Sequence, residues 1–433
     1  MQKQPVHTVV GGAHLFRRDT AAKLGRIAAR YLDRYAADPA ALAHALGNRP
    51  RPEIAEALPP ETAEAVHRRV RAKLEREPVE CFLIDFEDGF GARPEAEEDE
   101  AATATAAEVA AGAAAGSLPP SLGIRIKSLS ETTGGRALRT LELFLAALAR
   151  TGGELPDGFT VLLPKIVDAG QVERLAGALD RLEATLGLPE NRVGIDLMIE
   201  TPQSLVAPDG RIAVPGLVAA AGGRCRTVHL GAYDLTGAVA VAAEAQTLGH
   251  PLCDMARQLL QLSLGGSGVR LADGATNVLP VEPHRGTAEI SPAERAENAA
   301  VVHEAWRLHY ADVRRSLNQG FYQSWDLHPA QLVSRYAAVF SFFLEGLDAA
   351  ASRLDRFVSA AGQAVLTGSV FDDEASGQGL LNFFLRGLAS GALTAEEAAR
   401  SGLTPAELET RSFPAILADR GKTLPQRPER RGG

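Results

Sequence analysis

The stretch that decides the fold is Val193-Gly-Ile-Asp-Leu-Met-Ile-Glu200, which is followed by Thr201-Pro202-Gln203. Its apolar run is typical of a β-strand that is covered on both faces, and the run ends in a single carboxylate. Pro202 ends the strand because proline offers no N–H group to a neighbouring strand. The sequence therefore predicts one acid, Glu200, at the carboxyl end of a buried strand.

The same design recurs along the chain, as a short apolar run, a polar residue at its end and then a segment with helical spacing. The other predicted strands cover residues 8–10, 81–84, 123–127, 159–163, 227–230, 268–271 and 321–325. Eight strands that alternate with helices predict a parallel α/β arrangement, and hence a (β/α)8 TIM barrel. A doubly wound sheet is the alternative, but no Gly-x-Gly-x-x-Gly follows the first strand and polar tips end nearly every strand.

The barrel is expected to span residues 1–345, with an insertion at about 38–78, and a C-terminal helical extension is expected at 346–433. Helical patterns cover Ala330–Gly346 and Ala349–Leu366 as two separate helices. The final residues, from Gln426, are rich in Arg, Pro and Gly and are expected to be disordered.

The bulk composition excludes several classes of protein. The chain has 433 residues, a formal net charge of −9 and a pI near 5.7, so no basic face points to nucleic acid and an anionic membrane surface is not favoured. The three cysteines have no paired spacing, which argues against a disulfide framework and a zinc knuckle. No signal core and no membrane-spanning run are present, so we expect a cytoplasmic protein.

In a barrel, side chains at the carboxyl ends of the strands converge on one mouth. The tip residues expected there are Asp85, Glu87, Asp88, Arg125, Lys165, Glu200, Asp234, Asp273, Asp326 and His328. Carboxylates without thiols suit a hard cation such as Mg²⁺ or Mn²⁺. Glu200 and Asp234 follow adjacent strands and form the natural metal-binding pair. Arg125 is suited to bind a carboxylate or to stabilise an enolate.

Each tip residue also has a structural interpretation. Glu200 is equally consistent with a helix cap or an ion pair, and Asp234 is consistent with a cap of the next helix. At least one acid of the run 85–88 is expected to hold an arginine or backbone groups. Lys165 is consistent with a residue that only balances the acids, and His328 with one that orients its neighbours.

The tips resemble the motifs of the HpcH/HpaI aldolase and citrate lyase β-subunit superfamily over roughly residues 8–345. The matching motifs are Leu83-Ile-Asp85-Phe-Glu87-Asp88-Gly, Gly-Ile-Arg125-Ile, Pro164-Lys165, Met-Ile-Glu200-Thr-Pro, Leu-Gly-Ala-Tyr-Asp234 and the late run Gly320 to His328-Pro329-Ala-Gln331. The resemblance implies a (β/α)8 barrel that acts on C–C bonds with Mg²⁺ or Mn²⁺.

The resemblance also implies a role for each site residue. Glu200 and Asp234 are expected to bind the metal, and Arg125, Glu200 and Lys165 to contact the substrate. Arg125 is also expected to act in catalysis, and Glu87 or Asp88 to move the proton. The expected activity is that of an aldolase-type carbon–carbon lyase on a 2-oxo or hydroxy acid, a small-molecule carboxylate. The family also leads us to expect a homo-oligomer, a trimer or hexamer.

Two departures from the family weaken the case for a CoA substrate. The first strand carries no arginine, and the acidic run Glu95–Glu100 replaces the usual lysine and arginine of the following helix. Two alternatives stay open, namely a Claisen-type lyase of malyl-CoA or citramalyl-CoA type and a non-catalytic barrel that binds a 2-oxo acid. Related enzymes close the mouth with a C-terminal lid, for which the candidate is Gly368–Asp373.

Overall fold

The computed structural model describes residues 3–47, 58–153, 155–285, 290–359, 365–367, 370–372 and 374–420. The chain divides into two compact units, one formed by residues 1–57 and 70–336 and the other by residues 58–69 and 337–433. Three predicted segments lie partly or wholly outside the described residues. They are the insertion (residues 48–57), the candidate lid (residues 368, 369 and 373) and the predicted disordered end from Gln426.

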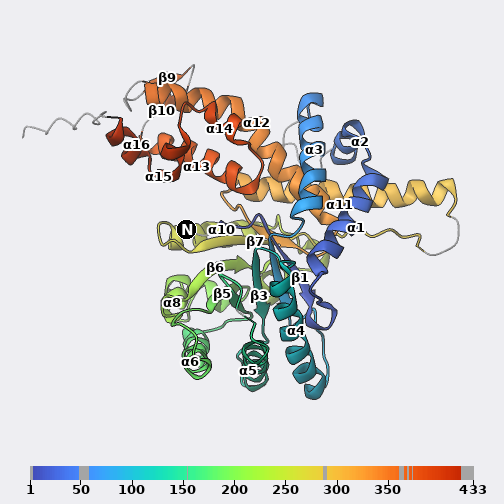
Figure 1. Ribbon diagram of the computed structural model, residues 1–433, viewed down its shortest axis with the longest axis vertical. Coiled ribbons are helices and arrows are strands. Elements are labelled where there is room, and N and C mark those ends of the chain that lie inside the picture. Colours follow the sequence, from blue (N-terminus) through green and yellow to red (C-terminus); the bar gives the residue numbers. More distant parts are fainter. Residues whose placement is uncertain are drawn as a thin grey trace, which may run out of the picture. The chain divides into compact units, whose positions relative to one another are not determined.

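The first unit is a closed barrel of eight parallel strands, each paired with its neighbours in chain order (Figure 1). The strands are β1 (His7–Gly12), β2 (Cys81–Asp85), β3 (Ser121–Arg125), β4 (Thr160–Leu163), β5 (Gly194–Ile199), β6 (Cys225–Leu230), β7 (Arg270–Ala275) and β8 (Ser324–Asp326). The predicted (β/α)8 fold is therefore confirmed, and the stretch that ends in Glu200 is the fifth strand.

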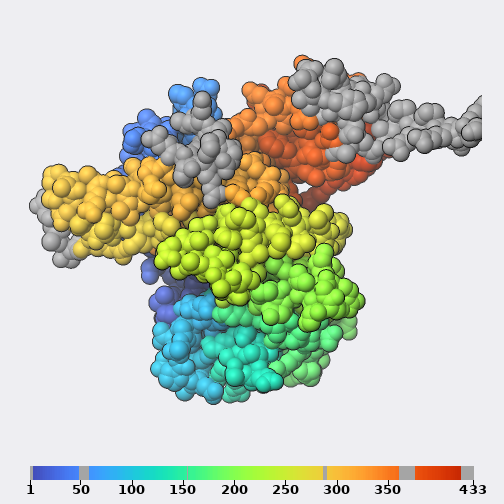
Figure 2. Space-filling view, turned by 180° about the vertical axis from the view of Figure 1, so that it is seen from behind, coloured from blue at the N-terminus to red at the C-terminus, as the bar shows by residue number. Residues whose placement is uncertain are grey.

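Helices follow the strands around the outside of the barrel. In the first unit they are α1 (Thr20–Tyr35), α2 (Pro39–Leu46), α4 (Glu95–Ala115), α5 (Gly134–Arg150), α6 (Ala169–Leu186), α7 (Pro202–Leu205), α8 (Val214–Ala220), α9 (Ala232–Ala238), α10 (Pro251–Leu264) and α11 (Pro292–Asn318), with 3-10 turns η1 (Ala13–Leu15) and η2 (Ala243–Ala245). The helices α3 (Pro60–Arg76) and α12 (Gln331–Ser359) contribute residues to both units. Figure 2 shows one face of the molecule, on which the colours of the barrel run in chain order from light blue through green to yellow-green.

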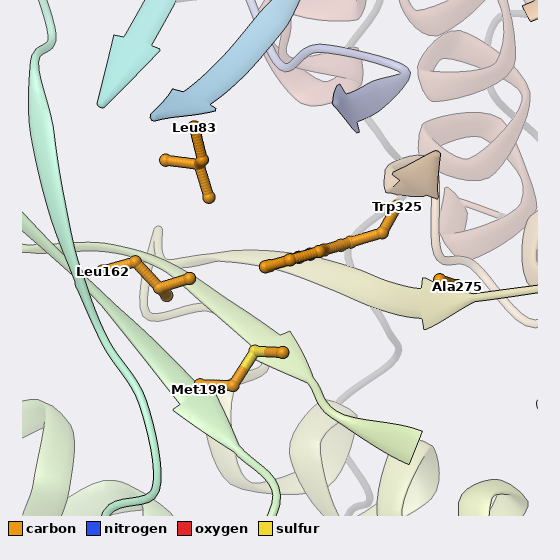
Figure 3. Packing of buried hydrophobic residues seen from close by; sticks show 5 residues of the cluster. All are labelled: Leu83, Leu162, Met198, Ala275 and Trp325. Carbon is orange, nitrogen blue, oxygen red and sulfur yellow. The ribbon is translucent and has the colours of Figure 1, made fainter. Parts of the chain in front are cut away.

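The interior of the barrel is closed by a layer of side chains from alternate positions of the strands. Leu83, Leu162, Met198, Ala275 and Trp325 form this buried cluster (Figure 3). Figure 3 shows the Trp325 indole extending from its strand toward Leu162, between Leu83 and Met198. Because successive side chains of a strand point to opposite faces, Asp85 and Glu200, each two residues beyond a cluster member, lie on the same inner face.

Two expectations about the elements are wrong. The seventh strand was expected to end at Leu271, but it runs from Arg270 to Ala275, with a register irregularity between Asp273 and Ala275. Asp273 therefore lies within the strand and not at its tip. The two helices expected across residues 330–366 are one continuous helix, α12, because neither Gly346 nor its polar neighbours interrupt the helical hydrogen bonds.

The second unit holds most of α12, a two-stranded antiparallel hairpin and four further helices. These elements are β9 (Val365–Thr367), β10 (Val370–Asp372), α13 (Glu374–Ser390), α14 (Ala395–Ala399), α15 (Pro405–Thr410) and α16 (Phe413–Asp419). Thr394 and Thr404 each begin a short helix with a reciprocal capping box. Within the described residues, none of the helices is both long and apolar enough to cross a membrane.

Candidate active site at the barrel mouth

A buried pair formed by Asp85 and Arg125 is the framework of the site. The two residues are direct neighbours in the pairing of β2 with β3. Arg125 donates through Nε to Asp85 Oδ1 (2.7 Å) and through Nη2 to Oδ2 (2.5 Å). The same carboxylate accepts the backbone N–H groups of Glu87 (2.9 Å) and Gly89 (2.7 Å). Asp85 is therefore the structural acid expected in this run, because it fixes both the arginine and the acidic loop.

The remaining nitrogen of Arg125 faces the two other acids of the run. Nη1 lies 3.1 Å from Glu87 Oε2 and 3.4 Å from Asp88 Oδ2. The bidentate edge that would suit a substrate carboxylate is engaged by Asp85, so Nη1 is the donor through which Arg125 faces the mouth. Arg125 is only 6% exposed, so its charge acts in a weakly screened environment.

Four acids, Glu87, Asp88, Glu200 and Asp234, are referred to as the acid cluster. Lys165 contacts the first three of them. Its backbone is in the left-handed region (φ 53°), which is uncommon for a residue other than glycine. In this conformation its N–H donates to Glu200 Oε1 (2.7 Å), while its ammonium group contacts Glu87 and lies 3.1 Å from Asp88 Oδ1. The strained residue thus contacts three acids at once, and backbone outliers of this kind are common at functional sites.

Glu200 is a buried carboxylate with one backbone partner. It is 2% exposed. Burial raises its pKa to about 8, the charge of Asp234 adds to this effect, and the N–H of Lys165 opposes it. Gly231 leaves room for this side chain, since a Cβ there would lie 2.4 Å from the Cβ of Glu200. Glu200 therefore neither caps a helix nor pairs with a cation side chain within the described residues, in contrast to its structural interpretation.

Asp234 lies in the first turn of α9, the helix that follows β6, and β6 is the neighbour of β5 in the barrel. The residue that precedes the helix is Gly231, and no side chain caps this end. Asp234 therefore does not act as the N-cap, although an acid in the first turn suits the helix dipole. It is exposed, whereas Glu200 is buried. The two acids are close enough for the charge of one to raise the pKa of the other.

These two acids fit a hard divalent cation. Among the described residues no group of three or more His, Cys, Asp or Glu side chains is arranged to hold a metal. The effect of Asp234 on the pKa of Glu200 is the observation that relates these two carboxylates. Mg²⁺ typically takes one or two carboxylates and completes its shell with water and substrate oxygens. A cation between Glu200 and Asp234 would also remove the unfavourable meeting of two negative charges.

Glu87 and Asp88 have opposite pKa shifts. Burial raises the pKa of Glu87 in spite of the charges of Arg125 and Lys165. For Asp88 burial acts in the same direction, but Arg125 and Lys165 outweigh it and the pKa is lowered. The side chain of Glu87 is 9% exposed and that of Asp88 is 58% exposed, which explains the difference. Environments that separate the pKa values of two neighbouring acids are typical of acid–base pairs.

Three of the expected tip residues belong to other interactions. Asp273 accepts hydrogen bonds from Arg257 on α10 and Ser316 on α11. Asp326 pairs with Arg335 on α12, and its oxygens lie near two histidines of the surrounding layer. His328 Nδ1 accepts the backbone N–H of Ala330 (3.2 Å), so this residue orients its own loop. The expectation that Asp273 and Asp326 join the acid cluster is wrong, because their carboxylates pair with side chains of the surrounding helices α10, α11 and α12.

Sequence reasoning overlooked three buried residues beneath the cluster: Trp325, His229 and Asp196. The centre of the Trp325 ring lies 5.7 Å from Cζ of Arg125. Trp325 Nε1 donates to His229 Nδ1 (2.9 Å), and His229 Nε2 lies 3.7 Å from Asp196 Oδ2. For Asp196 a signal was available, because it lies four positions before Glu200 and side chains at even spacing along a strand share a face.

Comparison with known proteins places this site in a familiar fold. A citrate lyase from Burkholderia xenovorans LB400 superposes with a TM-score of 0.57 at 19% identity, over 78% of this chain and 92% of that chain. Malate synthase from Haloferax volcanii superposes with a TM-score of 0.47 at 12% identity, over 92% of this chain and 97% of that chain. At these identities the likeness to the citrate lyase shows the fold alone.

At the level of sequence, no curated protein matches the chain. A family model described as a domain of unknown function, DUF6986, matches residues 1–416. This match covers nearly the whole chain, including Glu87, Asp88, Glu200 and Asp234 and most of the second compact unit. The chain therefore belongs to the DUF6986 family.

Proposed function

We propose that this protein is a Mg²⁺- or Mn²⁺-dependent carbon–carbon lyase of the aldolase type, which acts on a 2-oxo or hydroxy acid. The observation that carries the proposal is the buried Glu200, whose pKa is raised by burial and by Asp234. Two acids kept together without a cation side chain between them suit a divalent metal. The side-chain cations of Arg125 and Lys165 pair instead with Glu87 and Asp88.

Glu200 and Asp234 would hold the metal. When bound, the metal would polarise the carbonyl and carboxylate oxygens of a 2-oxo acid and thereby stabilise an enolate. Arg125 would donate from Nη1 to the oxygen on which negative charge develops. One preorganised donor of this kind typically contributes roughly 3 kcal/mol to the transition state.

Glu87 and Asp88 would transfer the proton during the reaction. In the direction of cleavage, the ionised acid of the pair takes the proton of the substrate hydroxyl group, and the electrons of the breaking C–C bond move to the enolate oxygen. The proton then returns to the enolate carbon. Lys165, which contacts both acids, holds them near each other and keeps one of them ionised.

The experiment that tests this function measures Mn²⁺ binding and then activity. Glu200→Gln and Asp234→Asn are each expected to weaken Mn²⁺ binding at least tenfold, about 1.4 kcal/mol or more. Glu183 is a matched control, because it is as buried as Glu200 but pairs with Arg224. Glu183→Gln is expected to lower stability and to leave Mn²⁺ affinity unchanged.

Activity is then screened with Mg²⁺ against hydroxy acids and 2-oxo acids, with release of a 2-oxo acid as the readout. Thioesters form a separate arm of the screen, since turnover of these alone would assign Claisen chemistry. Full Mn²⁺ affinity in both acid variants would refute the metal assignment. Tight binding of a 2-oxo acid without turnover of any substrate would indicate a binding protein.

A further inference from the structure

The interior of the barrel contains a chain of buried polar contacts that ends on Arg125. The indole of Trp325 lies against the guanidinium group, with 5.7 Å between Cζ and the ring centre. Trp325 and Arg125 are 4% and 6% exposed, so water screens this contact little. The electron-rich face of an indole attracts a cation, and more strongly when both are withdrawn from water. Trp325 therefore stabilises the guanidinium group of Arg125 through a cation–π contact.

His229 fixes the orientation of the Trp325 indole. Trp325 Nε1 donates to His229 Nδ1 at 2.9 Å, and the two rings meet edge to face with an interplanar angle of 86°. Because Nδ1 accepts a hydrogen bond, the ring carries its proton on Nε2. That proton faces Asp196, whose Oδ2 lies 3.7 Å away and accepts a hydrogen bond from Thr160 (2.8 Å).

The chain thus runs from Asp196 on β5 through His229 on β6 to Trp325 on β8 and Arg125 on β3. It crosses the barrel beneath the acid cluster, where Figure 3 shows the indole extending into the interior. Asp85 holds one edge of the guanidinium group and the Trp325 ring lies beside its Cζ, which leaves Nη1 facing Glu87 and Asp88. A rotation of the indole would remove this contact without touching either proposed metal ligand.

We propose that Trp325 is a positioning residue, which holds Arg125 for the carboxylate or enolate of the substrate, and that His229 sets the orientation of Trp325. The inference rests on the proposed function for the identity of the ligand, but the contact with Arg125 does not. Neither residue would touch the metal. Their loss is therefore expected to affect binding of an anionic ligand and to spare binding of the metal.

The first test needs no ligand. The chain has two tryptophans, and Trp306, the other one, is buried with its Nε1 bonded to the carbonyl of Ala330. In the Trp306→Phe protein all tryptophan emission comes from Trp325. Adding Arg125→Lys keeps the charge opposite Asp85 but removes the planar group from the indole, and is expected to change the emission spectrum. Identical spectra would overturn the proposal.

The second test uses oxalate, a planar dicarboxylate that chelates divalent cations, with the Mn²⁺-loaded protein. Trp325→Leu is expected to weaken oxalate binding roughly 30-fold, the value of a desolvated contact between a cation and an indole. His229→Leu is expected to weaken it about tenfold by releasing the N–H of the indole. His229→Gln, whose amide oxygen can accept the same hydrogen bond, should restore binding to within about threefold of the wild type.

Mn²⁺ affinity in the absence of oxalate should stay within about threefold of wild type in all these variants, and Trp306→Phe is the matched control for loss of a buried tryptophan. If His229→Leu does not fold, Trp325→Phe keeps a ring but lacks the N–H and should give an intermediate loss. Wild-type oxalate affinity in Trp325→Leu, or parallel loss of Mn²⁺ affinity and thermal stability, would overturn the proposal. A wild-type protein that binds no Mn²⁺ would instead refute the proposed function, while the emission test would still decide the role of Trp325.

Discussion

Metal binding at Glu200 should depend steeply on pH, because the acid must lose a proton to become a ligand. Its pKa is raised to about 8, first by burial and then by the charge of Asp234. Below this value the protonated form competes with the metal, so affinity falls about tenfold for each pH unit. Between pH 8 and pH 6 the apparent Mn²⁺ affinity should fall roughly 50-fold, about 2.3 kcal/mol.

The same reasoning predicts the number of protons released on binding. At pH 7, one unit below the pKa, the metal should displace roughly 0.9 proton from Glu200, and well above pH 8 it should displace almost none. Titration calorimetry in two buffers with different ionisation enthalpies measures this number directly. Glu200→Gln, which has no titrating carboxyl group at this position, should bind Mn²⁺ weakly and with little dependence on pH.

The sign of the effect also applies to stability. A carboxyl group whose pKa is higher in the folded than in the unfolded protein favours folding at low pH, and this contribution is lost as the pH rises from about 4.5 to about 8. The thermal stabilisation by Mg²⁺ should therefore be larger at pH 8 than at pH 6. A Mn²⁺ affinity that changes less than about threefold over this range, with release of less than about 0.2 proton at pH 7, would refute the reasoning.

Three further outcomes follow from particular contacts. Asp85→Asn should lower the free energy of unfolding by about 3–5 kcal/mol in urea titrations, because it leaves the buried charge of Arg125 without its main partner. Gly231→Ala should weaken Mn²⁺ binding at least tenfold by calorimetry, about 1.4 kcal/mol, since the added methyl group would displace the buried Glu200, the proposed metal ligand. The hydrogen bond from Arg420 lowers the pKa of Glu407 to about 2, so the C-terminal helices should lose protection from hydrogen exchange as the pH falls from about 4.5 to about 2.

Two of these predictions have a control within the chain. Gly216, in α8, has open space where a Cβ would lie, so Gly216→Ala should leave Mn²⁺ affinity unchanged. Arg420→Gln should remove the acid dependence of the C-terminal helices but not that of the barrel. An Asp85→Asn protein as stable as the wild type would show that Arg125 finds sufficient partners in the acidic loop.

The sequence was informative where a buried strand is marked by an uninterrupted apolar run. This was enough to predict the closed barrel and to bring Glu87, Asp88, Arg125, Lys165 and Glu200 together. It failed at the seventh strand, because Gly274 permits an irregular register and Arg257, on the preceding helix α10, holds the Asp273 carboxylate. Such a partner is chosen by tertiary packing and leaves no local pattern in the sequence.

The site itself was only half predictable for a related reason. Residue type and strand position identify which side chains can reach the mouth, but not which hydrogen bonds they have already formed. The engagement of the Arg125 fork by Asp85 and the support by Trp325 are of this kind. The first depends on the register of β2 against β3, and the second brings together β3 and β8, which are not neighbours in the barrel. Local sequence specifies neither.

The conformation of Lys165 has a consequence for how this protein tolerates mutation. Its backbone N–H orients Glu200, and every amino acid except proline carries that group. Its ammonium group serves Glu87 and Asp88, and few side chains replace it. The backbone and the side chain of Lys165 thus have two separable roles. Asparagine or glycine, which accept a left-handed backbone, would keep the first and lose the second, so substitution at this single residue separates the hydrogen bond to Glu200 from the contacts with Glu87 and Asp88.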